Sequence, residues 1–96
     1  MSPREQIQAQ IVGWLNAHKD KFNAPYGVLP SLDPIKNGKG KVRTVTFGQA
    51  RWLDATVFIW SPNHLTVQAA GPASVRFGYL TQFNNVNDVL TALDDL

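Results

Sequence analysis

The spacing of apolar residues changes along the chain, and this change fixes the class of fold. From Ile7 to Phe22 apolar residues recur at three- and four-residue steps, which is the repeat of one face of an α-helix. From residue 42 to residue 80 they mostly alternate with polar residues, as on a half-buried β-strand. The helical spacing returns between Val86 and Leu96. The sequence therefore predicts an α+β protein.

The first helical segment carries its own start signal. Ser2-Pro3-Arg4-Glu5 fits a capping box, in which the Ser2 hydroxyl accepts from the Glu5 amide and Pro3 suits the first helical position. We expect an N-terminal amphipathic helix of about five turns. Its apolar face is Ile7, Ile11, Trp14, Leu15, His18 and Phe22, and its polar face is Gln6, Gln8, Gln10, Asn16 and Lys19.

A long segment rich in proline and glycine follows. Residues 23–41 contain three prolines and three glycines: Pro25, Pro30, Pro34, Gly27, Gly38 and Gly40. Prolines at this spacing forbid a helix and a central strand, although a short extended edge around Val28–Leu29 is compatible with them. We expect a long Pro/Gly loop, and loops of this length are often functional.

Four alternating runs then predict a four-stranded antiparallel sheet, over residues 42–47, 53–60, 65–69 and 75–80. Turn residues separate them at Ser61-Pro62-Asn63-His64 and at Gly71-Pro72. After the sheet, Asn85 is a predicted N-cap. The C-terminal helix that it begins has an apolar face of Val86, Val89, Leu90, Leu93 and Leu96.

The length of 96 residues predicts a single compact domain over 1–96, because a second core would not fit. The chain has no cysteine. This excludes a disulfide scaffold, a cysteine nucleophile, and iron–sulfur and thiolate–zinc sites. No cofactor is expected.

Residues that could support catalysis are few and scattered. The two histidines, His18 and His64, are 46 positions apart. Ser61 shares a tight turn with His64, and nothing like a nucleophile elbow surrounds it. The lysines and glycines of residues 36–41 lack the spacing of a phosphate-binding P-loop. We predict no catalytic and no metal-binding residue, and expect a protein that is not an enzyme.

Two family resemblances rest on the order of elements. Asp54, with Gln68-Ala69-Ala70 in the next strand, resembles the core of restriction-type nucleases, but Ala70 stands where that family has its catalytic lysine. The helix–strands–helix order is similar to a double-stranded-RNA-binding domain. That family begins its last helix with lysines, whereas residues 84–88 hold only asparagines, a valine and an aspartate. Neither family's function carries over.

The charges are unevenly distributed. The formal net charge is only +2. Residues 36–51 nevertheless hold five basic residues and no acid, whereas the C-terminal residues 84–96 hold Asp88, Asp94 and Asp95 and no base. Basic residues among glycines favour contacts to phosphate. The predicted phosphate contacts are Lys36, Lys39, Lys41 and Arg43, supported by Arg51 and Arg76. The alternative is a solvated loop that its lysines keep soluble.

Aromatic residues on one strand suggest a second half of the site. If Leu53, Ala55, Val57 and Ile59 face the core, Phe58 and Trp60 lie on the opposite face. There they would stack on unpaired bases if the face is open. The alternative is that the C-terminal helix covers this face and buries both rings.

The resulting hypothesis is a small non-enzymatic module that binds nucleic acid. Its rival is a protein–protein interaction or inhibitor protein of the viral or plasmid accessory type. That protein would use the same aromatics or the acidic face of Asp88, Asp94 and Asp95. The polar start and the absence of a long apolar run predict a cytoplasmic protein without a membrane partner. An exposed sheet edge would also allow a homodimer.

Overall fold

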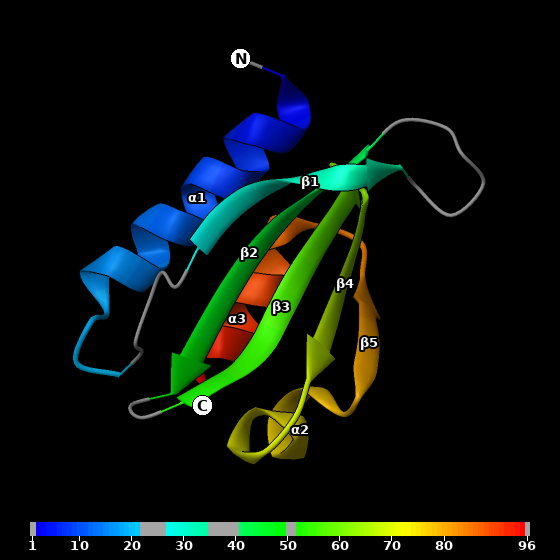
Figure 1. The fold of residues 1–96 in the computed structure, drawn as a ribbon. Helices are drawn as coiled ribbons and strands as arrows, with labels where there is room; N and C mark the ends of the chain where they lie inside the picture. The colour runs from blue at the N-terminus through cyan, green and yellow to red at the C-terminus, as the bar shows by residue number, and fades with distance from the viewer. Residues whose placement is uncertain (1, 22–26, 35–40, 50–51, 96) are drawn as a thin grey trace.

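The computed structural model describes residues 2–21, 27–34, 41–49 and 52–95 (Figure 1). The element order is α1 (Pro3–Ala17), β1 (Gly27–Pro34), β2 (Lys41–Gln49), β3 (Trp52–Ser61), β4 (His64–Ala69), α2 (Pro72–Phe77), β5 (Leu80–Phe83) and α3 (Val86–Asp94). The predicted α+β class is confirmed, with a helix before an antiparallel sheet and a helix after it.

The strands form one sheet in chain order, β1-β2-β3-β4-β5, and each strand is antiparallel to the next. Alternate residues of the central strands are buried on one face, as the predicted alternation requires. These buried residues are Val45, Phe47, Ala55, Val57, Ile59, Leu65, Val67 and Ala69. We call this the inner face and the opposite one the outer face.

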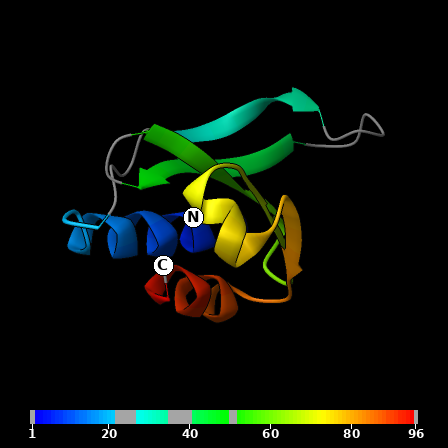
Figure 2. The ribbon, with the colours of Figure 1, turned by 90° about the horizontal axis from the view of Figure 1, so that it is seen from below.

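Both long helices pack on the inner face. Ile11 and Leu15 of α1 and Val89 and Leu93 of α3 belong to the same core cluster as the inner-face residues. Figure 2 shows α1 and α3 side by side on one side of the sheet. In the part of the chain that the structure describes, no helix covers the outer face.

The N-terminal capping box is confirmed. The Glu5 amide donates to the Ser2 hydroxyl oxygen at 3.2 Å, and the hydroxyl donates in turn to the Glu5 carboxylate at 3.3 Å. The helix is shorter than the predicted five turns, because α1 ends at Ala17. At this end the His18 amide donates to the Leu15 carbonyl, and the His18 ring bonds the Trp14 carbonyl at 2.7 Å. The side chain thus takes the carbonyl that a further helical turn would use.

The assignment of Gln8 to the polar face is wrong. Gln8 is only 6 % exposed, and its amide nitrogen donates to the Thr44 carbonyl of β2 at 3.0 Å. Gln8 precedes Ile11 by three positions and Leu15 by seven, so it lies on the helical stripe that faces the sheet. It is buried because the backbone of β2 offers it an acceptor.

Within the predicted Pro/Gly loop, residues 27–34 form the edge strand β1. The register pairs Pro30 with Arg43 and Pro34 with Lys41. A proline cannot donate a backbone hydrogen bond, and an edge strand can leave that side unpaired. The fifth strand therefore lies at an edge of the sheet, where its prolines are tolerated. The flanking parts of the loop, residues 22–26 and 35–40, lie outside the described residues.

The predicted strand over 75–80 is wrong. Residues 72–77 form α2, which starts with Pro72 and ends at Gly78, whose φ of 73° is the left-handed conformation that glycine adopts readily. Val75 is exposed and Phe77 is buried, where it packs edge-to-face on Phe83 of β5. Strand β5 begins only at Leu80.

The C-terminal helix is confirmed from its N-cap to Leu93, and the predicted Leu96 lies outside the described residues. Asn85 is the N-cap, and its side-chain oxygen accepts from the Asp88 amide at 2.9 Å. Val86, Val89 and Leu93 are buried, and Leu90 is half-buried against the core. This helix packs on the inner face and does not cover the outer face of the sheet.

Candidate functional site

The outer face of the sheet carries polar and aromatic side chains in two cross-strand rows. The register aligns Thr44, Phe58, Thr66 and Gln82 in one row, and Thr46, Thr56, Gln68 and Leu80 in the next. None of these side chains is fully buried. The outer face therefore presents threonine and glutamine hydrogen-bonding groups around a strip of aromatic residues on β3 and at the start of β4.

That strip is a row of three rings. The Phe58 and Trp60 ring centroids are 6.1 Å apart with the planes inclined by 20°, and the His64 ring lies 6.2 Å beyond Trp60 at 30°. We call these residues the aromatic row. The Trp60 indole N–H donates to the Thr66 hydroxyl at 2.9 Å across the β3–β4 pair. This bond satisfies the indole and holds the ring in one orientation.

The question that the sequence left open for Phe58 and Trp60 has a structural answer. Both side chains are half-buried, and they lie on the face opposite α1 and α3. The C-terminal helix does not bury them, because its own apolar face packs against the inner side of the sheet. Their described neighbours on the outer face include each other's rings and Thr66.

The predicted basic residues are only partly located. Lys36, Lys39 and Arg51 lie outside the described residues. Lys41 and Arg43 belong to β2 and Arg76 belongs to α2, but the structure describes only their backbones. That the side chains of these six residues contact phosphate therefore stays a prediction.

The backbone nevertheless separates these residues into two groups. Arg43 pairs with Ile59 of β3 and Lys41 with Pro34 of β1, so the start of β2 lies at the end of the sheet where Trp60 and His64 lie. Arg76 lies in α2, which follows β4 at the opposite end of the sheet (Figure 1). The fold brings the backbones of Lys41 and Arg43 to the same end of the sheet as the aromatic row and places Arg76 at the other end. Arg43 opposes the inner-face residue Ile59, so its register position belongs to the inner face.

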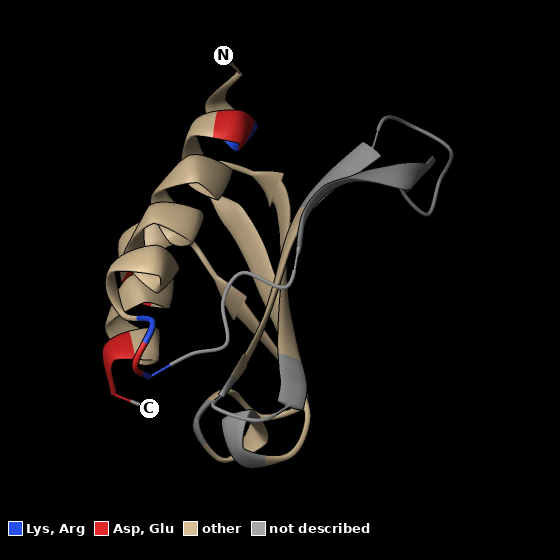
Figure 3. Cartoon of the chain, turned by 60° about the vertical axis from the view of Figure 1, so that its left-hand side comes forward, with Lys and Arg blue, Asp and Glu red and all other residues tan. Residues whose placement is uncertain are grey.

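Charge also divides the described part of the molecule by layer. The charged residues whose side chains the structure describes all lie on α1, on the turn after α1 or on α3 (Figure 3). They comprise five acids (Glu5, Asp20, Asp88, Asp94 and Asp95) and three bases (Arg4, Lys19 and Lys21). The layer formed by α1, the turn after it and α3, which we call the helical layer, therefore carries more acidic than basic residues. In the sequence, the excess of basic residues lies in the strands and in the segments that connect them.

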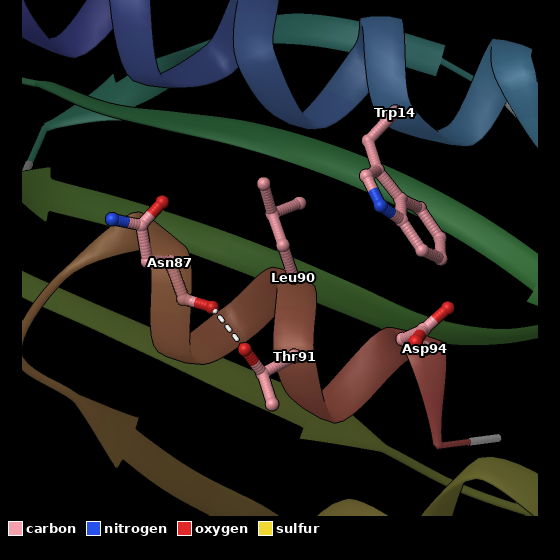
Figure 4. Close-up of a pocket in the computed structure, with 5 residues that line it drawn as sticks. All are labelled: Trp14, Asn87, Leu90, Thr91 and Asp94. Carbon is pink, nitrogen blue, oxygen red and sulfur yellow. Dashed lines mark hydrogen bonds between the residues drawn. The ribbon is translucent and has the colours of Figure 1, made fainter.

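A hollow on the helical layer is a second candidate. It has a volume of about 380 Å³ and lies between α1 and α3, lined by Trp14, Asn87, Leu90, Thr91 and Asp94 (Figure 4). Its polar groups are partly used within the fold. The Thr91 hydroxyl donates to the Asn87 carbonyl at 2.9 Å, and Trp14 stacks on His18 with ring centroids 3.8 Å apart.

The acidic face of the rival hypothesis is partly occupied by structural bonds. The Asp88 carboxylate accepts from the Asn85 amide group at 3.1 Å as part of the N-cap. The Asp94 carbonyl accepts from the Lys21 ammonium at 2.7 Å, which joins the C-terminal ends of α1 and α3. These contacts give α3 a role in the fold that its charge alone did not predict.

The residues that the structure describes contain no group of three or more His, Asp or Glu side chains placed to hold a metal ion. Within the same residues, none of the helices has the length and apolar character needed to cross a membrane.

Comparison with models of protein families, with curated proteins and with solved structures finds no match to this chain. The outer face and the chemistry of its side chains are therefore the features of this chain that point to a function.

Proposed function

We propose that the protein is a small non-enzymatic module that binds single-stranded nucleic acid on the outer face of its sheet. The observation that carries this proposal is the aromatic row on a face that no described helix covers. Nucleobases are flat and stack on aromatic side chains, at about 1–3 kcal/mol per base. A duplex keeps its bases stacked on one another, so unpaired bases suit this surface best.

The side chains around the row supply groups that bases can recognise. Thr66 and Gln82 lie in the same register row as Phe58. Hydroxyl and amide groups both donate and accept hydrogen bonds, so they match the mixed donors and acceptors of base edges. Since Thr66 already accepts from Trp60, Gln82 is the more available partner for a base.

Phosphate contacts are proposed for the basic segment at the start of β2. Lys41 and Arg43 belong to the end of the sheet that holds Trp60 and His64, and Lys36 and Lys39 precede them in the sequence. Arg51 and Arg76 are proposed as supporting contacts. The net acidic helical layer would repel a phosphate backbone, which favours binding on the sheet side.

The stacking part is tested by titrating a short labelled single strand of DNA or RNA at low salt. Phe58→Leu removes a ring and keeps an apolar side chain, and we expect about tenfold weaker binding. Phe83→Leu is the matched control, because it makes the same change at a half-buried ring that packs on Phe77 of the inner face. Equal loss in both variants, or no binding by the wild type, would refute the proposal.

The phosphate part is tested through salt dependence. Lys39 and Lys41 are replaced together by Ala. The slope of log K against the logarithm of the salt concentration is then expected to become shallower by about 0.7 for each phosphate that is no longer neutralised. Lys19→Ala is the control, because Lys19 is exposed after α1 on the helical layer. A slope that responds equally to Lys19→Ala would place the phosphate contacts elsewhere.

The rival proposal is a protein partner on the same outer face. It is favoured by the observation that the described side chains of this face include no Lys, Arg, Asp or Glu. A purified complex that survives nuclease treatment and is disrupted by Phe58→Leu would support the rival over nucleic acid.

A further inference from the structure

The two edges of the sheet differ in their capacity to pair with another chain. At one edge, β1 contains Pro30 and Pro34 and its register with β2 is interrupted between them. Prolines and irregularities of this kind protect an edge against further pairing. At the other edge, β5 has the sequence Leu80-Thr81-Gln82-Phe83, with no proline and no charge. The β5 edge has no proline, no charge and no break in its register, although the strand is short.

The hydrogen-bonding pattern shows which backbone groups of β5 point outwards. The Ala69 amide donates to the Tyr79 carbonyl at 3.1 Å, in register with the pairing of Val67 with Thr81. Residues of an antiparallel pair point their N–H and C=O alternately towards the partner strand and away from it. Tyr79 and Thr81 are therefore directed to β4, and Leu80 and Gln82 direct their backbone groups away from the sheet.

Apolar side chains are exposed at the same edge. Tyr79 is 81 % exposed and Leu80 is 68 % exposed, two of the large apolar side chains most open to solvent in the described residues. No described segment lies beyond β5 in either view of the ribbon (Figures 1 and 2). Outward backbone groups and exposed apolar side chains thus coincide on a strand of only four residues.

We propose that β5 is the contact between two copies of this chain, paired antiparallel so that the two sheets become one. In the joined sheet, two directly opposed residues lie on the same face. A two-fold axis perpendicular to the sheet therefore has to lie level with one residue of each strand, because an axis midway between two residues would oppose side chains of different faces. With the axis at Thr81, Leu80 opposes the second copy's Gln82. Each such pair exchanges both of its backbone hydrogen bonds, which uses the outward groups of both strands.

The same register covers the exposed apolar side chains. Tyr79 comes opposite the second copy's Phe83 and Leu80 lies beside its Gln82, while Thr81 meets the second copy's Thr81. Threonine–threonine and aromatic pairs are favourable across antiparallel strands. A second copy is the occupant that this edge fits, because one register satisfies both chains with identical contacts.

The proposed dimer is weak, because strands this short bury much less surface than a stable interface of about 1,600 Å². We expect a monomer in dilute solution and a dimer at high protein concentration. The experiment is sedimentation velocity together with amide hydrogen exchange over a series of concentrations, without nucleic acid. Where about nine-tenths of the chains are dimeric, exchange at the Leu80 and Gln82 amides is expected to slow about tenfold. Thr81, which is already directed to β4, is expected to change little.

A pair of matched variants locates the contact. Leu80→Lys places a charge on the edge and is expected to abolish dimerisation. Val75→Lys makes an equivalent change on α2, where Val75 is 90 % exposed, and is expected to leave the dimer intact. A chain that stays monomeric at all concentrations would overturn the proposal, and the edge would then be open only to a strand of another protein. Equal loss in both variants would overturn it as well.

Discussion

At the scale of single residues, Gln8 shows how one polar side chain ties the first helix to the sheet. It is the only polar side chain among the described residues that is buried, and its amide donates to the Thr44 carbonyl. A buried amide that kept no partner would cost about 1–3 kcal/mol. The bond therefore makes a polar residue tolerable between α1 and β2, and it fixes where α1 lies along β2.

We predict that Gln8→Ala lowers the free energy of unfolding by about 1–2 kcal/mol, because it removes this bond and leaves a gap in the packing. Urea unfolding followed by circular dichroism measures the change. Gln10→Ala is the control, since Gln10 is exposed on the same helix and its loss is expected to stay within about 0.5 kcal/mol. If both variants lose the same stability, the contact with Thr44 contributes nothing.

Residue-scale patterns also explain which parts of the candidate site were predictable. Phe58 and Trp60 were placed together on the outer face because alternation along a strand depends only on neighbours in the chain. Neither the contribution of His64 to the aromatic row nor the bond from Trp60 to Thr66 was predicted. Both depend on the register of β4 against β3. Alternation along either strand shows which face a residue lies on, but it does not show which residue of the other strand lies opposite.

At the scale of elements, caps decide where the helices begin. Both long helices start at a polar residue whose side chain accepts a hydrogen bond from the backbone, Ser2 for α1 and Asn85 for α3. The cap of α3 has further importance because the helix brings Val89 and Leu93 into the core. Loosening its first turn would loosen that packing as well.

We predict that Asn85→Ala lowers the free energy of unfolding by about 1 kcal/mol, because the Asp88 amide loses its acceptor. The midpoint of urea denaturation reports the loss. Asn84→Ala changes the same residue type one position before the cap, where the side chain is exposed, and is expected to have little effect. A comparable loss at Asn84 would mean that the cap lies elsewhere.

The element that sequence patterns assigned incorrectly is α2. Val75, Phe77 and Tyr79 alternate as in a strand, but Pro72 begins a helix and Phe77 alone of the three is buried. The burial of Phe77 depends on Phe83, which lies on a different element. Short segments take the conformation that the surrounding core selects, so their local pattern is a weak guide.

At the scale of the whole molecule, the sheet has one face packed against helices and one face that no described helix covers. The core cluster lies between the inner face and the helices, and the outer face carries the aromatic row and two rows of polar side chains. Adjacent residues of β3 therefore have very different roles. Val57 is fully buried between Val45 and Val67, whereas Thr56 lies on the outer face between Thr46 and Gln68.

We predict that Val57→Ala lowers the free energy of unfolding by about 2 kcal/mol, since it removes two buried methyl groups. Thr56→Ala, one residue away, is expected to cost less than about 1 kcal/mol. Chemical denaturation of both variants measures the difference. Similar losses would show that the outer face is packed as well, which would also remove the basis for a binding surface there.

Interactions between near neighbours in the chain were readable from the sequence alone. The α+β class, the start of α1, the N-cap of α3 and the two faces of β3 all follow from periodicity and capping, which involve residues a few positions apart. The tertiary structure alone decided the pairing of β1 with β2, the burial of Gln8, the helical state of residues 72–77 and the face that α1 and α3 cover. Each depends on groups far apart in the sequence, because a backbone acceptor, an edge or an apolar face is available only once distant segments have packed together.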